Sequence, residues 1–221
     1  MHDINAILKN RTEAGKILAE KLLQFTPSNP IVLALPRGGV VVGCEVAKAL
    51  KAPMDTIIVR KIGAPMNPEF AIGAITAKSE IINDETVRAL GISDEKLQEI
   101  KFREKKELER RASIYKSGQF GDGGKYDVVI LVDDGFATGL TAEAGIKEAR
   151  LSYSSAELIV AVPVCAFSTG IELAKKSDKF VCLMEPINLN AISLWYEDFL
   201  QISDDEVIKC LKEANKDISE F

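Results

Sequence analysis

The sequence contains a single histidine, His2, near the start of its 221 residues. Residues at a chain terminus are seldom held in place, so His2 is a poor candidate for a catalytic or metal-binding group. This argues against Ser-His-Asp and Cys-His nucleophilic systems and against zinc sites built on histidine. Any chemistry must therefore rely on carboxylates, lysine, arginine, hydroxyl groups, backbone amides and an added metal ion.

Paired cysteines, long apolar runs and excess positive charge are also missing. The four cysteines lie far apart without a Cys-x-x-Cys pair, which predicts reduced thiols in a cytoplasmic protein: Cys44, Cys165, Cys182 and Cys210. No run approaches about 18 apolar residues, and the first residues lack the apolar core of a signal peptide, so we expect no membrane partner. The formal net charge of −5 argues against nucleic acid as a partner.

What the sequence does contain is an alternation of short apolar runs with amphipathic segments. The runs predict strands at 31–35, 56–59, 70–75, 80–82, 128–132, 158–162 and 180–184. The amphipathic segments predict helices at 11–25, 40–50, 93–116, 141–150, 168–175 and 204–215. Such alternation implies right-handed crossovers, and hence an α/β fold with a mostly parallel sheet flanked by helices. Ligands of such sheets bind beyond the carboxyl ends of the strands.

The length suits a single domain over residues 1–221. Residues from about 64 to 124 depart from the alternation, and we interpret them as an inserted helical or flexible segment. Within it, residues 101–111 (KFREKKELERR) are dense in charge. We interpret this run as a solvated helix face with pairs of opposite charge. The alternative is a basic arm that closes over a polyphosphate or a partner subunit.

The most informative stretch is 128–141, VVILVDDGFATGLT. An apolar strand is followed by two carboxylates, Asp133 and Asp134, then by a loop of small residues and a helix. Small residues let the backbone fold closely around a ligand, and the amides at a helix N-terminus attract anions. The layout therefore predicts a cradle for a phosphorylated sugar, with the carboxylates facing sugar hydroxyls or a hydrated Mg²⁺. The alternative is an ordinary turn with exposed acids.

Two further elements carry positive charge at predicted strand ends. In the run 35–43, LPRGGVVVG, Arg37 can bind phosphate oxygens, while Gly38 and Gly39 allow close backbone approach. The pair Arg60-Lys61 follows the predicted strand 56–59 and could contact a leaving pyrophosphate. Taken alone, each element can also be a solvent-exposed turn or basic pair.

The motif DDGFATGLT closely resembles the phosphoribosyl pyrophosphate (PRPP) signature of the type I phosphoribosyltransferase family. The Arg-Gly-Gly turn resembles the pyrophosphate loop of that family, which often carries a non-proline cis peptide bond. The stretches NRTEAGKILAEKL, GAPMNPEFAIGAI and LWYEDF are similar to a poorly characterised branch, so the resemblance covers nearly the whole chain. It implies a phosphoribosyltransferase-like core with a hood and C-terminal helix over about 185–221.

The resemblance also implies a function. The chain would be a Mg²⁺-dependent glycosyltransferase that moves phosphoribosyl from PRPP to a nitrogenous base, releases pyrophosphate and serves nucleotide salvage. The implied 5-phosphate site is Ala137, Thr138, Gly139, Leu140 and Thr141; the pyrophosphate site is Arg37, Gly38, Gly39, Arg60 and Lys61; and the catalytic residues are Asp133, Asp134, Arg37 and Lys61. Asp133 and Asp134 would hold the ribose hydroxyls, directly or through Mg²⁺-bound water.

The acceptor base is not fixed by the sequence. In the run 185–199, Trp195 and Tyr196 are candidates for stacking on a base, and the alternative is a packed aromatic cluster. Enzymes that act on hypoxanthine and guanine usually carry an Asp where this chain has Ala137. A 6-oxopurine acceptor is therefore disfavoured, although a carboxylate such as Glu185 could substitute.

Two other functions are consistent with parts of the sequence. A non-catalytic PRPP or nucleotide sensor would need the same fold and the same phosphate cradle. A phosphorelay receiver beginning at the LVDD run is disfavoured because too few residues follow Asp133 to complete such a domain. For the transferase, the family resemblance and the long charged helix predict a homodimer.

Overall fold

The computed structural model describes residues 7–116, 120 and 126–218; His2 lies outside them. At its centre is a five-stranded sheet in the order β2-β1-β6-β7-β8, and every neighbouring pair is parallel. The strands are β1 (Pro30–Ala34), β2 (Met54–Thr56), β6 (Val128–Val132), β7 (Glu157–Val164) and β8 (Lys179–Met184). The prediction of an α/β fold with a mostly parallel sheet is confirmed.

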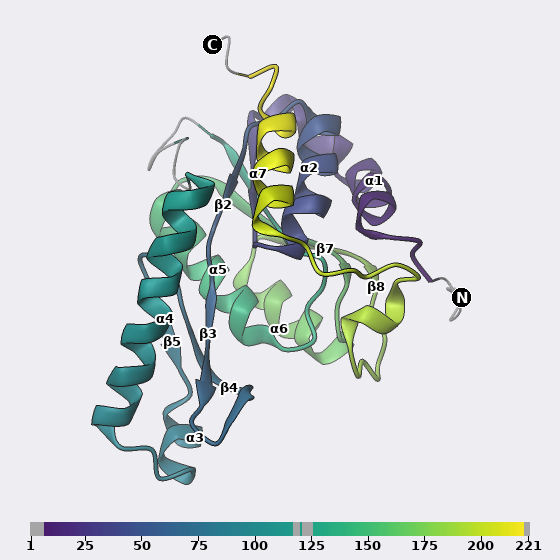
Figure 1. The fold of residues 1–221 in the computed structure, drawn as a ribbon. Coiled ribbons are helices and arrows are strands. Elements are labelled where there is room, and N and C mark those ends of the chain that lie inside the picture. The colour runs from purple at the N-terminus through teal and green to yellow at the C-terminus, as the bar shows by residue number, and fades with distance from the viewer. Residues whose placement is uncertain (1–6, 117–119, 121–125, 219–221) are drawn as a thin grey trace.

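Helices cover both faces of this sheet (Figure 1). Helices α1 (Arg11–Leu22), α2 (Gly38–Leu50) and α7 (Asp204–Ala214) pack on one face, and α5 (Gly139–Ser152) and α6 (Phe167–Lys176) pack on the other. Successive side chains of a strand point to opposite faces, so Val32 joins the first helical layer while Ile31 and Leu33 join the second. All five residues of β1 are buried, as expected for a central strand.

The predicted strand 56–59 is misplaced. Strand β2 ends at Thr56, and β3 (Arg60–Ala64) begins a different sheet. Ile57 and Ile58 are buried although they lie in the connection between the two sheets. A short apolar run cannot by itself distinguish a buried strand from a buried connection. Consequently Arg60 and Lys61 begin a strand of the second sheet.

The second sheet is antiparallel, in the order β3-β4-β5, and β4 (Asn67–Ile75) and β5 (Glu80–Ile82) form a hairpin where strands 70–75 and 80–82 were predicted. Together with α3 (Asp84–Ala89) and α4 (Asp94–Tyr115) it forms an extension from the central sheet (Figure 1). A small core, which includes Ile62, Ile72 and Ile100, holds it together. Residues 117–119 and 121–125, at the end of the predicted insertion, lie outside the described residues.

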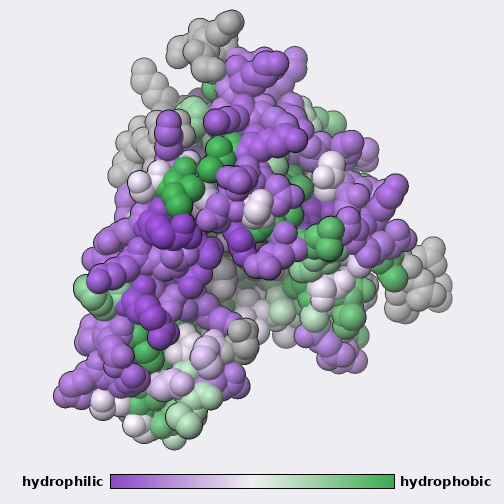
Figure 2. All heavy atoms as spheres, viewed as in Figure 1, coloured by the Kyte–Doolittle hydropathy of each residue, from purple (hydrophilic) through white to green (hydrophobic). Residues whose placement is uncertain are grey.

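Helix α4 carries opposite-charge pairs along its exposed surface, as predicted. Glu107 binds both Arg110 and Arg111, at 2.7 and 2.8 Å, and these guanidinium groups lower the pKa of Glu107 to about 2. One carboxylate of the helix faces inward instead, because Glu104 is 8% exposed and binds Arg60 of β3. Figure 2 shows a largely hydrophilic face, with a hydrophobic area at the tip of the extension. Met66, between β3 and β4, is exposed.

The start of the described chain pairs with residues 195–197, close to β8. The Leu8 N–H donates to the Trp195 carbonyl at 3.0 Å, and the Glu197 N–H donates to the Leu8 carbonyl at 2.8 Å. Trp195 ends the short helix η2 (Ile192–Trp195) in the predicted hood. All four cysteines are free. Within the described ranges, none of the helices combines the length and apolarity that crossing a bilayer requires.

Candidate functional site

The acidic pair and the Arg-Gly-Gly turn meet at the carboxyl edge of the central sheet. Strands β1 and β6 are parallel neighbours, with Ala34 paired to Val132, so the loops that follow them leave the sheet side by side. The Leu35 N–H donates to the Val132 carbonyl at 2.9 Å and extends this pairing into the loops. The peptide bond between Pro36 and Arg37 is cis, as expected for the turn.

The two glycines of the turn lie directly against the two acids. A Cβ atom on Gly38 would overlap the Asp134 carboxylate, and one on Gly39 would lie 2.7 Å from the Asp133 Cα. Only hydrogen fits at either position without moving the acidic loop. Both glycines fall in the first turn of α2, which begins two residues before the predicted helix. The close approach explains why this turn needs two consecutive glycines.

Asp134 is held by residues from opposite ends of the chain. The Arg11 Nε donates to Asp134 Oδ2 at 2.7 Å, and Arg11 Nη1 donates to the Leu200 carbonyl at 2.8 Å. The guanidinium carbon lies 3.6 Å from the centre of the Phe199 ring. The Tyr196 hydroxyl donates to the Asp134 carbonyl at 2.7 Å. Side chain and backbone of Asp134 are thus fixed separately.

Sequence reasoning missed Arg11. It is the first residue of α1 and only 8% exposed. A cation at a helix N-terminus is disfavoured by the helix dipole, so an arginine at that position indicates a partner elsewhere. This unfavourable position at the helix N-terminus was the sequence signal that could have identified Arg11.

The surroundings of both acids raise their pKa values. Burial, followed by the neighbouring Asp134 charge, raises the pKa of Asp133 well above 3.8. Burial also raises the pKa of Asp134, and the Arg11 charge opposes that rise. Asp133 Oδ1 accepts from the Asp134 N–H at 2.8 Å. Two carboxylates so placed favour a cation or hydroxyl donors nearby.

The loop after the acids is fastened to its neighbours. The Phe136 N–H donates to the Val164 carbonyl, and the Ala166 N–H donates to the Phe136 carbonyl, both at 3.0 Å. The Thr169 hydroxyl donates to the Ala137 carbonyl at 3.3 Å. These bonds fix the entrance to α5 against β7 and α6.

The amino end of α5 carries the predicted phosphate cradle. Thr138 is the N-cap residue, it is exposed, and its side chain does not cap the helix. Gly139, Leu140 and Thr141 follow as half-buried residues of the first turn. Their amides have no partner within an α-helix, so they can donate to an anion.

Arg60 and Lys61 are placed differently from the other predicted cations. Arg60 Nη2 donates to Glu104 Oε2 at 2.7 Å, which links β3 to α4. Lys61 is exposed on the same strand. Both residues line a cavity of about 330 Å³ between β3 and α4. Arg37, in contrast, is the N-cap residue of α2 and belongs to the turn that packs on the acids.

The predicted base-stacking residues lie in an aromatic cluster of the hood. Tyr196 is 5% exposed, and its ring centre lies 5.0 Å from that of Phe199. Trp195 is half-buried and packs against the same cluster. The Ile192 Cδ1 atom would lie 2.7 Å from a Cβ atom added to Gly135. The hood therefore contacts the acidic loop. Stacking of a base on either ring stays a prediction.

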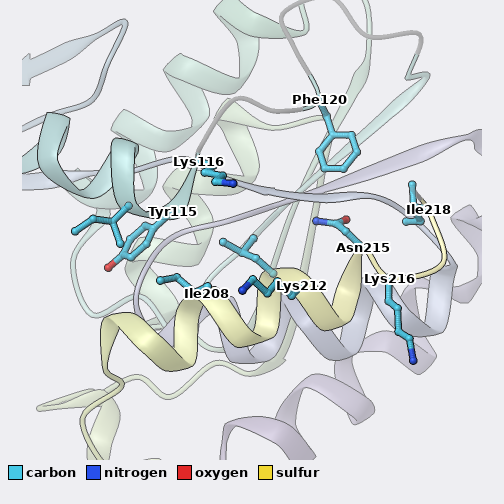
Figure 3. A pocket seen from close by; sticks show the side chains of 10 residues that line it. Tyr115, Lys116, Phe120, Ile208, Lys212, Asn215, Lys216 and Ile218 are labelled. Atoms are coloured by element: carbon cyan, nitrogen blue, oxygen red, sulfur yellow. The ribbon is translucent and has the colours of Figure 1, made fainter. Parts of the chain in front are cut away.

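A larger cavity lies away from these loops, between the end of α4 and α7 (Figure 3). It measures about 520 Å³, and its wall includes Lys116, Lys212 and Lys216. Asn215, also in the wall, bonds to the backbone N–H and carbonyl of Met54, the first residue of β2. The cavity therefore reaches the amino edge of the sheet, opposite to the acidic pair.

Comparison with known proteins agrees with the geometry. A family model described as the phosphoribosyl transferase domain matches residues 3–197. The solved structure of TT1426 from Thermus thermophilus is 34% identical and superposes with a TM-score of 0.72 over 94% of this chain and 98% of its own.

Two Mycobacterium tuberculosis proteins, from strains CDC 1551 / Oshkosh and H37Rv, share 37% identity over 215 residues. Each is named "Putative phosphoribosyl transferase". The match covers 97% of this chain and 48% of each of them. The chain thus spans about half the length of these curated relatives.

Proposed function

The chain belongs to the phosphoribosyl transferase family, and we propose that it transfers phosphoribosyl from PRPP to a nitrogenous base, with Mg²⁺ and with release of pyrophosphate. The observation that carries the proposal is the packing of Gly38 and Gly39 against Asp134 and Asp133. This packing joins an anion-binding turn to a pair of carboxylates at one edge of the sheet. PRPP presents the matching groups, two hydroxyls between two phosphate ends.

The 5-phosphate would bind at the amino end of α5. Ala137 and Thr138 are exposed there, and the first-turn amides point out of the helix. A phosphate in this position gains several N–H donors and the positive end of the helix dipole. The bonds that fix Phe136 and Ala137 to β7 and α6 supply the rigidity that precise binding needs.

The ribose hydroxyls would bind to Asp133 and Asp134. Burial is the main cause of their raised pKa values, and a divalent cation would favour the charged form of both carboxylates. No group of three or more His, Cys, Asp or Glu suited to a metal ion occurs in residues 7–116, 120 and 126–218. The pair Asp133 and Asp134 fits Mg²⁺, which usually keeps several waters and binds through one or two carboxylates plus substrate phosphates. When bound, Mg²⁺ would neutralise charge on the pyrophosphate.

The leaving pyrophosphate would bind to Arg37 and the amides of Gly38 and Gly39. Arg60 and Lys61 would contribute from β3 of the second sheet. As the bond to the ribose breaks, negative charge grows on the pyrophosphate and positive charge grows on the sugar ring. Cations and amides fixed on one side, and carboxylates on the other, would stabilise both charges without reorganisation.

The acceptor base would lie under the hood. Trp195 is half-buried at its edge, whereas Tyr196 already serves the acidic loop through its hydroxyl group. Glu185 is exposed directly after β8 and could accept a proton or a hydrogen bond from the base. A homodimer and a cytoplasmic location remain part of the proposal.

Pyrophosphate release tests the proposal. With PRPP, Mg²⁺ and a panel of purine and pyrimidine bases, we expect release that depends on one base or a small set of bases. A coupled pyrophosphate assay measures it, and calorimetry measures PRPP binding separately. PRPP binding without release on any base would favour the alternative, a sensor built on the same fold. Absence of PRPP binding would contradict both.

The dependence of kcat/KM on pH is a second test. Because the pKa values of Asp133 and Asp134 are raised above 3.8, we expect activity to be lost on acidification at a pH clearly above that value. Removing the opposing charge in Arg11→Met should move this acid limb to still higher pH. An acid limb at or below pH 4 in the unmodified protein would contradict the assignment.

The raised carboxyl pKa also predicts how the stability of the fold changes with pH. A carboxyl group whose pKa is raised by folding binds more protons in the folded state, so the charged form of Asp133 destabilises the fold as pH rises above the ordinary carboxyl value. Mg²⁺ should therefore raise the Tm more at neutral pH than at pH 4.

A further inference from the structure

A groove of about 570 Å³ lies outside the proposed active site. Its walls are the 76–79 loop that joins β4 to β5, the middle of α4, and α5. Four lysines line it: Lys78, Lys101, Lys105 and Lys147. They come from three separate elements, so only the fold brings them together. We define these four residues as the lysine groove.

Lys101, Lys105 and Lys147 bring more positive charge to the groove than the carboxylate among its described lining residues can balance. Glu80 is the one carboxylate among the described lining residues, and it binds Lys101 at 2.7 Å. The buried Glu148 lies behind the loop and accepts from the Lys78 backbone N–H at 3.3 Å. The Lys147 ammonium donates to the Glu80 carbonyl at 3.2 Å, and the Lys78 ammonium donates to the Ser152 hydroxyl at 3.0 Å, so neutral oxygens also hold lysines of the groove in place.

Helix dipoles do not explain these lysines. Lys101 and Lys105 lie four residues apart within α4, which runs from Asp94 to Tyr115, and like charges at that spacing destabilise a helix. The cavity in Figure 3 differs in this respect, because its three lysines lie at the carboxyl ends of α4 and α7. Cations are favourable there without any ligand.

An exposed aromatic ring borders the lysines. Phe102 lines the groove and is 62% exposed, and the Lys106 ammonium lies 4.5 Å from its ring centre. A ring of this kind offers a surface on which a planar base can stack. The volume lies within the usual 300–1,000 Å³ of small-molecule sites. Cations for several phosphates and a ring for one base match a ligand that carries both a polyphosphate and a base.

We propose that the lysine groove binds a nucleoside polyphosphate, with the phosphates on Lys78, Lys101, Lys105 and Lys147 and the base against Phe102. This gives the charge-dense run of α4 a role in polyphosphate binding, although at a site separate from the acids. Two elements of the groove also carry residues of the proposed active site. Helix α5 carries the phosphate cradle at its amino end, and Ile75, in the groove wall, pairs with Arg60 of β3. The inference does not depend on the proposed transferase activity.

Calorimetric titration with ATP, in EDTA and low salt, tests the proposal. We expect binding that weakens at least tenfold in Lys101→Ala/Lys105→Ala and also in Lys147→Ala. The matched control, Lys175→Ala/Lys209→Ala, removes two exposed lysines from α6 and α7 and should bind like the unmodified protein. Phe102→Ala should weaken ATP binding while leaving inorganic tripolyphosphate binding unchanged.

A variant of the Arg-Gly-Gly turn separates the groove from the proposed active site. Arg37→Ala should keep the ATP affinity of the groove. The proposal is overturned if ATP and tripolyphosphate give no binding heat. It is equally overturned if Arg37→Ala abolishes the heat while the groove variants retain it, since ATP would then bind beside the acids. Circular dichroism of each variant establishes that it is folded, and the variants replace exposed or partly exposed side chains.

Discussion

Asp134→Asn is expected to lower kcat/KM for PRPP by about 100-fold or more. The asparagine keeps the shape of the side chain but loses the charge that would face the developing positive charge on the ribose. Removal of a single preorganised electrostatic contact commonly costs about 100- to 1,000-fold in rate. Steady-state pyrophosphate release at saturating base measures the effect. Unchanged turnover in a folded Asp134→Asn protein would contradict the assigned role.

The same substitution should also destabilise the protein, because it leaves the Arg11 guanidinium without its carboxylate. The two side chains are 9% and 15% exposed, so water replaces the lost partner only in part. We expect a loss of roughly 1–3 kcal/mol, seen as a lower Tm by differential scanning calorimetry. In the double variant Arg11→Met/Asp134→Asn, Tm should recover while activity does not.

Asp133→Asn is the matched comparison. Asp133 Oδ1 accepts a hydrogen bond from the Asp134 N–H, and the amide oxygen of asparagine can accept it equally well. We therefore expect a comparable loss of activity with a smaller loss of stability. Equal falls in Tm for both acid variants would indicate that Arg11 does not distinguish the two acids.

Gly38→Ala should abolish measurable turnover. The added methyl group would overlap the Asp134 carboxylate and lie 2.9 Å from Arg11 Nε, so the acid, the arginine or the turn must move. Displacement of a catalytic group by about 1 Å can cost about 100-fold in rate. Gly39→Ala should behave alike, because its methyl group would meet the backbone of Asp133. PRPP affinity by calorimetry and kcat together measure the change.

Gly145→Ala provides the control for a glycine substitution. Gly145 lies within α5, and the nearest atoms to an added methyl group are the flexible side-chain ends of Leu35 and Leu131, at 3.2 and 3.3 Å. Alanine also favours a helix by about 1 kcal/mol over glycine, which offsets this crowding. We expect nearly unchanged activity and Tm. Near-normal activity in Gly38→Ala would show that the turn and the acids are not coupled.

Local patterns predicted the parts of the site that are contiguous in sequence. The apolar run 128–132, the acids and the small-residue loop identified one strand-to-helix turn, and the Arg-Gly-Gly run identified another. Their contact followed from the parallel sheet, because both turns leave carboxyl ends of its strands. The contacts of Asp134 could not be read in this way. Its partners Arg11 and Tyr196 are 123 and 62 residues distant, and no periodicity reports on them.

Arg60 shows a second reason why sequence patterns could not predict the whole site. The basic pair was expected at the end of a core strand, but the chain crosses to another sheet at residues 57–59, and Glu104 of α4 binds the arginine. Pairing of this kind depends on how two elements pack, whereas sequence pattern describes each element by itself. Tyr196 is similar: an aromatic residue near a hood suggested stacking, and its buried hydroxyl group anchors the acidic loop.

The dual anchoring of Asp134 also sets the order in which the protein can mature during translation. Arg11 leaves the ribosome early, but Tyr196 and the Leu200 carbonyl emerge only after β8, the last strand of the central sheet in the described residues. A nascent chain halted near residue 190 would have a nearly complete sheet and an acidic loop still without its last supports. Competence to bind the sugar pyrophosphate should therefore be acquired only after residue 200 has emerged.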